Sequence, residues 1–203
     1  MKECRNIKAC REIRRKNWGE ISVGIHNLTL KTYAKYQECV LRFYVAIGKL
    51  TKTPLLGPLI RILGNWYGKN LHKAYLLTHE EAVEIVDACN SIAVGSCSCR
   101  KVFQNCDSPI ETDMVIGVGR DIFSEVEKRE YRVVSKEEAR EILEKCRLRG
   151  LVHRLSRCKK DFYAICNCCR CCCVPTRLAR IYEIKNALVR DQYVVHKVKN
   201  SLL

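Results

Sequence analysis

The chain has 203 residues, and its 47% hydrophobic and 29% charged residues indicate a folded globular protein and exclude a disordered one. Its formal charge of +15 favours an acidic protein partner or an anionic lipid surface, although deprotonated metal-binding cysteines would lower that charge. No aromatic RNA-binding signature accompanies the basic residues, which argues against nucleic acid as the partner.

Residues 1–70 predict a basic helical N-terminal arm. Apolar residues recur between His26 and Lys49 at three- and four-residue spacing, as on one face of a helix. Thr53-Pro54 and Gly57-Pro58 interrupt this pattern, and we expect a second unit to begin near Leu71.

The N-terminal sequence lacks the apolar core and cleavage site of a secretory signal, so we expect a cytoplasmic protein. Residues 40–50 and 54–68 are apolar stretches that carry arginine or lysine, and both are too short to span a bilayer. We expect them to pack on the core or on a partner subunit. A peripheral contact with the inner membrane face is the alternative.

Residues 71–203 predict a small domain of alternating helices and strands, which gives an α/β fold class. Thr78 and Ser135 each begin a predicted helix, and a glutamate three residues later completes a capping box in both. Gly150 ends the second helix. The expected strands are short, mostly apolar runs at residues 92–95, 113–117, 131–134, 150–155 and 161–165.

Nine of the fifteen cysteines are crowded into two short loops, which we expect to form a metal site. Adjacent cysteines cannot pair with one another without strain, so disulfides do not explain the crowding. The strands at residues 92–95 and 161–165 each lead into one of these loops, so both loops should meet in one place. The predicted ligands are Cys97, Cys99 and Cys106 in the first loop and Cys166, Cys168, Cys169, Cys171, Cys172 and Cys173 in the second.

The spacing of these cysteines favours a polynuclear centre. Structural zinc usually takes two C-x2-4-C pairs, whereas this chain has C-x-C and C-C spacings. Iron–sulfur clusters are held by cysteine thiolates, and nine ligands suffice for one or two [4Fe-4S] clusters or for a larger unusual cluster. Zinc and copper are the alternatives.

Four motifs between residues 57 and 195 resemble those of a family of archaeal and bacterial 4Fe-4S ferredoxin-like proteins. They are Cys97-Ser-Cys99-Arg100, Cys106-Asp-Ser-Pro-Ile-Glu-Thr112, Gly150-Leu-Val-His153 and Ile165-Cys-Asn-Cys-Cys-Arg-Cys-Cys-Cys173. The resemblance implies iron–sulfur binding and redox work, and it names no substrate.

Two differences from that family shape the expectations. Its members often continue into a C-terminal ferredoxin domain, whereas no cysteine follows Cys173 here, so we expect a separate protein to carry the electrons onward. Some members have a cysteine where this chain has Asp113. Either Asp113 supplies an oxygen ligand to the cluster, or a spare cysteine or the substrate occupies that ligand position.

Arg100 and Asp113 are the candidate cofactor-binding residues beside the ligands. Arg100 follows Cys99 directly and can donate hydrogen bonds to a sulfide or to an anionic substrate, or it can be a surface arginine. His153 lies on an apolar strand, so we expect it to be a hydrogen-bonded core histidine, with a role as proton donor as the alternative.

The leading functional hypothesis is a cytoplasmic iron–sulfur protein that transfers electrons, as a subunit of a redox complex or as the partner of an acidic ferredoxin-like protein. A second hypothesis is a cluster-based reductase that acts on a sulfur compound at an open iron. A third is a structural zinc protein that binds nucleic acid or protein. Common enzyme motifs such as G-x-G-x-x-G and H-E-x-x-H are absent from the sequence, so whether the protein is an enzyme stays open.

Overall fold

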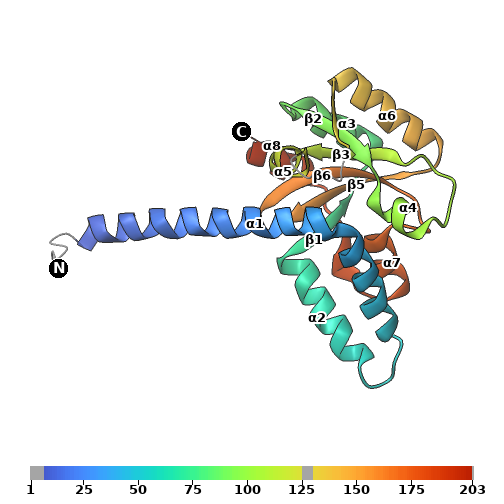
Figure 1. Ribbon diagram of the computed structural model, residues 1–203, viewed down its shortest axis with the longest axis horizontal. Coiled ribbons are helices and arrows are strands. Elements are labelled where there is room, and N and C mark those ends of the chain that lie inside the picture. The colour runs from blue at the N-terminus through green and yellow to red at the C-terminus, as the bar shows by residue number, and fades with distance from the viewer. Residues whose placement is uncertain (1–6, 125–129, 203) are drawn as a thin grey trace.

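The computed structural model describes residues 7–124 and 130–202, which form an α/β fold (Figure 1). The helices are α1 (Ile7–Leu50), α2 (Gly57–Asn70), α3 (His79–Ala88), α4 (Ser98–Phe103), α5 (Val118–Ser124), α6 (Lys136–Leu148), α7 (Val174–Ile181) and α8 (Val194–Leu202), with a 3-10 turn η1 (Lys185–Ala187). The strands are β1 (His72–Leu76), β2 (Ile92–Ser96), β3 (Glu111–Ile116), β4 (Arg132–Val134), β5 (Val152–Cys158), β6 (Asp161–Cys168) and β7 (Leu188–Arg190).

The strands of this described part make one sheet in the order β4-β2-β3-β6-β5-β1-β7. Strand β3 pairs antiparallel with both β2 and β6, so β2 and β6 run in the same direction and end at the same edge of the sheet. This confirms that two strands deliver the two cysteine loops to one place. Strand β6, however, runs to Cys168 and not only to Ile165.

The predicted helix ends are largely confirmed. Thr78 caps α3 with a complete capping box, in which its side chain accepts from the Glu81 amide and the Glu81 carboxylate accepts from the Thr78 amide. At α6 only half of the predicted capping box forms. The Ser135 side chain accepts from the Glu138 amide, but the Glu138 carboxylate pairs with Arg132 on β4 and not with the Ser135 amide, so the prediction of the second bond was wrong. Gly150 follows α6 with φ of 70°, which only glycine adopts without strain.

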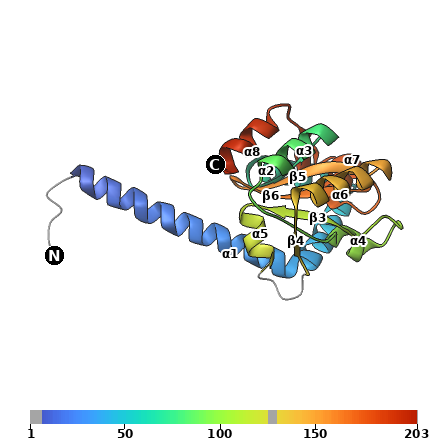
Figure 2. The same cartoon turned by 90° about the horizontal axis from the view of Figure 1, so that it is seen from above.

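Helices cover both faces of the sheet, and the strands alternate between two cores. Buried residues of α3, α6 and α8 pack on one face, against Ile92, Val94 and other strand residues. Residues of α1 and α5 pack on the other face, against Ala93 and Val115 (Figure 2). Because successive strand residues point to opposite faces, each strand residue near the cysteines belongs to one of these two sides.

Helix α1 bends at Tyr36, where φ is −109° and ψ is 18°. Before the bend, Leu30 and Ala34 pack on the sheet, and the N-terminal portion of the helix extends away from it (Figure 1). The part after the bend runs beside α2 to form a helical hairpin. The second part also packs against α4 and α7, and Leu41 and Val45 are buried there. Helix α2 ends at Asn70, one residue before the expected boundary, and the division into residues 1–70 and 71–203 stays a prediction.

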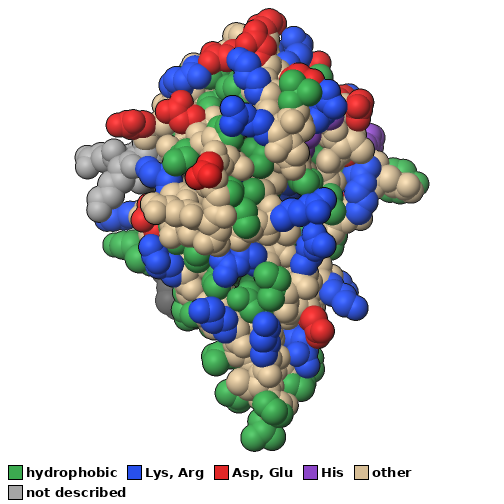
Figure 3. Space-filling model, turned by 90° about the vertical axis from the view of Figure 1, so that its right-hand side faces the viewer, with side chains coloured by type: hydrophobic (Ala, Val, Ile, Leu, Met, Phe, Trp, Pro, Cys, Tyr) green, Lys and Arg blue, Asp and Glu red, His purple; other side chains and the backbone are tan. Residues whose placement is uncertain are grey.

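Charge and apolar surface are unevenly distributed over the molecule. On the face shown in Figure 3, acidic side chains are most frequent in the upper part, where lysine and arginine lie among them, whereas lysine and arginine predominate in the middle and lower parts. Hydrophobic side chains occupy the lower tip, which is the end of the α1–α2 hairpin. Among residues 7–124 and 130–202, none of the helices combines the length and the apolar character needed to cross a bilayer.

Candidate metal centre

The nine predicted ligands lie together at one edge of the sheet, but they form two groups instead of one. All nine are free thiols. Each group takes cysteines from both loops. The outer cysteine group consists of Cys106, Cys169, Cys171 and Cys172. The inner cysteine group consists of Cys97, Cys99, Cys166, Cys168 and Cys173, which interact electrostatically with one another.

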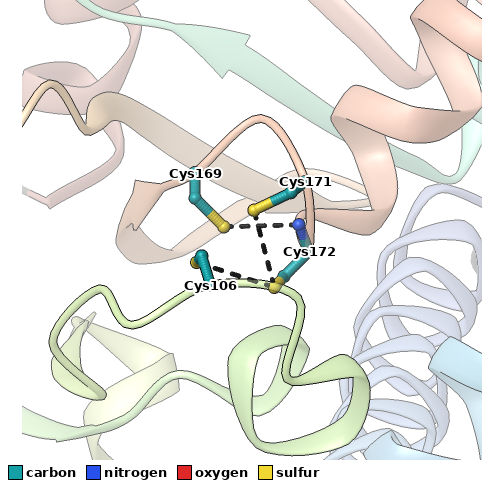
Figure 4. A group of neighbouring side chains, drawn as sticks. All are labelled: Cys106, Cys169, Cys171 and Cys172. Carbon is teal, nitrogen blue, oxygen red and sulfur yellow. Dashed lines mark hydrogen bonds between the residues drawn. The ribbon is translucent and has the colours of Figure 1, made fainter.

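The four sulfurs of the outer cysteine group all lie within 4.8 Å of one another (Figure 4). Cys172 Sγ is 3.9 Å from Cys106 Sγ and 3.8 Å from Cys171 Sγ. A single tetrahedral ion with metal–sulfur bonds of about 2.3 Å holds its four sulfurs about 3.8 Å apart. Two of the sulfur–sulfur distances already match this value, so the outer cysteine group could hold a metal ion.

The thiols of the outer cysteine group differ in how readily they ionise. Burial raises the pKa of Cys171 and Cys172, and nearby hydrogen-bond donors oppose this effect. The backbone amides of Asn105 and Cys172 donate to Cys172 Sγ and Cys169 Sγ, both over 3.3 Å. The Ser108 hydroxyl, 3.4 Å from Cys106 Sγ, lowers the pKa of that thiol to about 6. Because metals bind the thiolate form, a lowered pKa assists metal capture at neutral pH.

The strand geometry of β6 explains why the second loop splits between the two groups. Cys166 and Cys168 are two residues apart on β6, so their side chains point to the same face, toward α1. The chain then turns beyond the sheet edge, where Cys169, Cys171 and Cys172 reach the outer cysteine group. Cys173 returns to the inner side as the residue that precedes α7.

Arg154 is the centre of the inner cysteine group. It lies on β5 opposite Cys166 and is buried, and its guanidinium donates to Cys173 Sγ over 3.3 Å. Cys99, Cys166 and Cys168 also interact electrostatically with this charge. Its Nε atom has no hydrogen-bond partner. A buried cation needs a compensating anion, and the surrounding cysteines can supply it as thiolates, free or bound to metal.

The inner thiols fall into two kinds. Cys168 and then Arg154 lower the pKa of Cys173 to about 5, and Thr176, 3.1 Å from its sulfur, acts in the same direction. Cys168 and Arg154 likewise lower the pKa of Cys166, which also contacts the Asp113 carboxylate at 3.1 Å. Burial instead raises the pKa of Cys97 to about 12. Burial also raises the pKa of Cys99 well above its usual range, and hydrogen bonds with Cys166 and Cys173 do the same for Cys168. Cys97, Cys99 and Cys168 therefore all resist ionisation without a metal.

Arg100 and Asp113 lie within this centre: Arg100 interacts with both cysteine groups, and Asp113 contacts the inner one. Arg100 is 2% exposed, which excludes a surface arginine; it donates to the Asn167 carbonyl over 2.8 Å and to the Thr112 hydroxyl. Burial opposes its charge, but Cys97 and Cys169, one from each group, outweigh that effect and raise its pKa. Asp113 lies opposite Cys166 in the sheet and accepts a hydrogen bond from Tyr131.

No protein-family model, curated protein or solved structure matches this chain. The resemblance to the 4Fe-4S ferredoxin-like family therefore stays an expectation that rests on the four motifs.

Cys89, Cys146 and His153 were expected to be core residues outside the two loops. Cys89 is buried in the apolar core, as small core residues are, whereas Cys146 is buried in a cluster with Cys169 and Cys172 and so does not stand apart from the outer cysteine group. His153 is buried between two partners, with Nδ1 2.6 Å from the Asn167 side chain and Nε2 3.1 Å from His79. Asn167 faces this side because it alternates with Cys166 and Cys168 along β6.

Sequence reasoning missed Arg154. The available signal was an arginine inside the apolar stretch GLVHRL, at a position that alternates with His153 and Leu155. A charged residue in the middle of a buried strand requires a partner of opposite charge, and the cysteines are the nearest candidates in the sequence.

A cavity of about 380 Å³ reaches the inner cysteine group from the side of α1 and α2. Cys97, Cys99, Cys166 and Cys168 line one end of it. The inner cysteine group is therefore accessible to a small molecule, whereas the outer cysteine group reaches solvent through the exposed Cys171.

Proposed function

We propose that this protein is an iron–sulfur protein that transfers electrons. The inner cysteine group would hold the cluster, and the outer cysteine group would hold a single tetrahedral metal ion. The observation that carries the proposal is the buried Arg154 charge, surrounded by thiols of the inner cysteine group. An iron–sulfur cluster bound by four thiolates would place a lasting negative charge beside this buried cation.

Four inner cysteines suffice for one [4Fe-4S] cluster. Cys99, Cys166, Cys168 and Cys173 interact with Arg154 and are the proposed ligands, with Cys97 as the spare thiol. A cluster has several irons, each with its own thiolate, so its cysteines need not crowd as closely as those around one ion. The short sulfur–sulfur distances of the outer cysteine group favour one ion there, either zinc or iron.

Metal analysis tests the proposal directly. Anaerobically purified protein is expected to contain about four irons and about four acid-labile sulfides per chain, and one further metal ion without sulfide. Elemental analysis with a sulfide assay measures both, and electron paramagnetic resonance after reduction identifies the cluster. A colourless protein with zinc and no sulfide would disprove the iron–sulfur proposal.

A second candidate function is a reductase that uses the cluster to act on a small molecule. The cavity supports it, because it gives a small molecule access to the inner cysteine group. Asp113, in contact with Cys166, could replace a thiolate on one iron and leave that iron more open to substrate. Cluster ligation by the Asp113 carboxylate, detected by a spectral change in Asp113→Asn, would favour the reductase over simple electron transfer.

The proposed partner is an acidic redox protein that docks near the outer cysteine group. Arg170 is exposed between Cys169 and Cys171, and Lys101 is exposed two residues after Cys99. Electrostatic attraction should weaken as salt shortens the Debye length from about 10 Å at 0.1 M to about 3 Å at 1 M.

We expect Arg170→Glu to weaken binding of an acidic ferredoxin by about three- to tenfold at low salt, measured by surface plasmon resonance. Lys160→Glu is the control, because Lys160 is exposed in the β5–β6 turn, at the opposite end of these strands from the cysteine loops. Equal effects of the two substitutions would mean that only net charge matters. Tighter binding of RNA than of any acidic protein at matched ionic strength would contradict the proposed partner.

A further inference from the structure

The cavity has a polar end and an apolar end. The inner cysteine group lies at the first end, and helices α1 and α2 form the second, with Ile47, Ile60 and Leu63 in the wall. The charged residues that line the cavity are Arg154 and Asp113, and both are engaged with cysteines. An anionic head group would find no further cation in the described wall, so the cavity suits a neutral, largely apolar ligand.

An aromatic cluster lies between the two ends. The His72 ring is 5.6 Å from Tyr33, 5.8 Å from Tyr163 and 6.5 Å from Tyr67, measured between ring centroids. His72 Nε2 is 3.3 Å from the Tyr163 hydroxyl, and burial lowers the pKa of His72 to about 4. Flat rings with neutral hydrogen-bonding groups at their edges suit a ligand whose head is itself a flat ring bearing carbonyl oxygens.

The apolar end of the cavity opens beside an exposed apolar surface. On α2, Leu59, Ile62, Leu63 and Trp66 follow helical spacing and are all more than half exposed. Leu55 at the hairpin tip is 92% exposed. Leu63 belongs to both the surface and the cavity wall, so the two are continuous.

Basic residues accompany this apolar tip. Lys49, Lys52 and Lys69 are exposed on the same hairpin, and Figure 3 shows lysine and arginine side chains above the hydrophobic tip. An exposed apolar helix face with neighbouring lysines matches the chemistry of an anionic bilayer, into which the apolar residues insert while the lysines meet the head groups. An acidic protein would satisfy the lysines but would leave the apolar tip uncovered.

We propose that the α1–α2 hairpin rests on an anionic bilayer and that the cavity binds a lipid-soluble quinone that enters from it. Both parts of this proposal are based on the hairpin, the aromatic cluster and the cavity walls. Neither part depends on which metal the cysteines bind. The inference therefore goes beyond the proposed function and can fail independently of it.

Vesicle flotation tests the membrane part. The full chain, purified anaerobically, is mixed with phosphatidylcholine vesicles that contain either no charged lipid or about 30% phosphatidylglycerol, and is then floated on a density gradient. We expect flotation with the anionic vesicles, and Ile62→Glu should lower the recovered fraction at least about fivefold. Leu148→Glu is the matched control, because Leu148 is 71% exposed on α6, away from the hairpin, and Ile62 is 67% exposed.

Three results would overturn the membrane part. The first is an equal decrease of the floated fraction with Ile62→Glu and Leu148→Glu. The others are equal flotation with charged and uncharged vesicles, and no flotation of the unmodified protein. If an acidic redox protein added to the mixture abolishes flotation, the hairpin is its docking surface and the inference also fails.

Retention of a quinone tests the cavity part. Decylubiquinone is the probe, because its fully substituted ring has no vacant position for a thiol to add. After gel filtration and solvent extraction, we expect about one quinone per chain and little 1-decanol, which is uncharged and has a chain of the same length but no ring. Ile47→Trp, in the cavity wall, should lower quinone retention several-fold while the protein still floats with anionic vesicles.

Leu63→Trp, at the exposed mouth of the cavity, is a second obstructing variant that does not disturb the interior. Retention of 1-decanol equal to that of the quinone would overturn the ring specificity. Undiminished quinone retention in both tryptophan variants would place the ligand elsewhere and overturn the cavity assignment.

Discussion

Cys168→Ser is expected to remove the cluster from the inner cysteine group and to leave the outer ion in place. Cys168 interacts with Cys166, Cys173 and Arg154, so its loss takes away one of four proposed ligands at the centre of the group. Iron and acid-labile sulfide should fall from about four each per chain to below about one. Cys106→Ser should do the opposite, with the loss of one metal ion and unchanged sulfide.

Cys39→Ser is the control for this pair, because Cys39 is exposed on α1 and belongs to neither group. The Cys39→Ser variant should contain as much iron, sulfide and zinc per chain as the unmodified protein. If Cys168→Ser and Cys106→Ser each lose all metal and all sulfide, the nine cysteines hold one joint centre and the division into two sites is wrong.

Local patterns predicted most strands and helix starts, because those signals lie within a few residues. Thr78 with Glu81 specified a capping box that depends on neighbouring backbone amides alone. The run at residues 92–95 is apolar because both faces of β2 are covered by helices. At Ser135 the same pattern was misleading, since Arg132 on β4 competes for the Glu138 carboxylate.

The division of the cysteines could not be predicted from spacing alone. The second loop had been expected to begin at Cys166, whereas β6 continues to Cys168 and fixes which cysteines share a face. The short outer distances arise because the turn after β6 meets the loop that carries Cys106, across more than sixty residues of sequence. Such a contact depends on the sheet order, which no local pattern contains.

The surroundings of the centre were the least predictable part. Arg154 was overlooked because it lies in an apolar strand without a cysteine beside it in the sequence. The cavity depends on α1 and α2 lying against the cysteine side of the sheet, and the pattern of residues 1–70 indicated helices without indicating where they pack.

Arg154→Met is expected to lower the midpoint reduction potential of the cluster by on the order of 100 mV, which rests on the iron–sulfur proposal. A unit charge about 5 Å from the cluster, at an effective dielectric constant of about 20, contributes about 3 kcal/mol. Reduction adds negative charge to the cluster, so removal of the buried cation makes reduction less favourable and lowers the potential. For a one-electron couple, about 59 mV corresponds to a tenfold change in the equilibrium constant. Redox titration followed by electron paramagnetic resonance measures the shift.

Two matched variants distinguish the effect of charge from that of packing. Arg154→Lys keeps the charge and should recover most of the potential, although a lysine cannot reproduce the geometry of the guanidinium. Arg157→Met changes an arginine that lies three residues nearer the β5–β6 turn on the same strand and packs over the Tyr75 ring. It should leave the potential within about 20 mV of the original, because a more distant charge is better screened. If Arg154→Met and Arg157→Met shift the potential equally, or if Arg154→Lys lowers it as much as methionine does, then Arg154 holds the cysteine loops by packing and its charge does not set the potential.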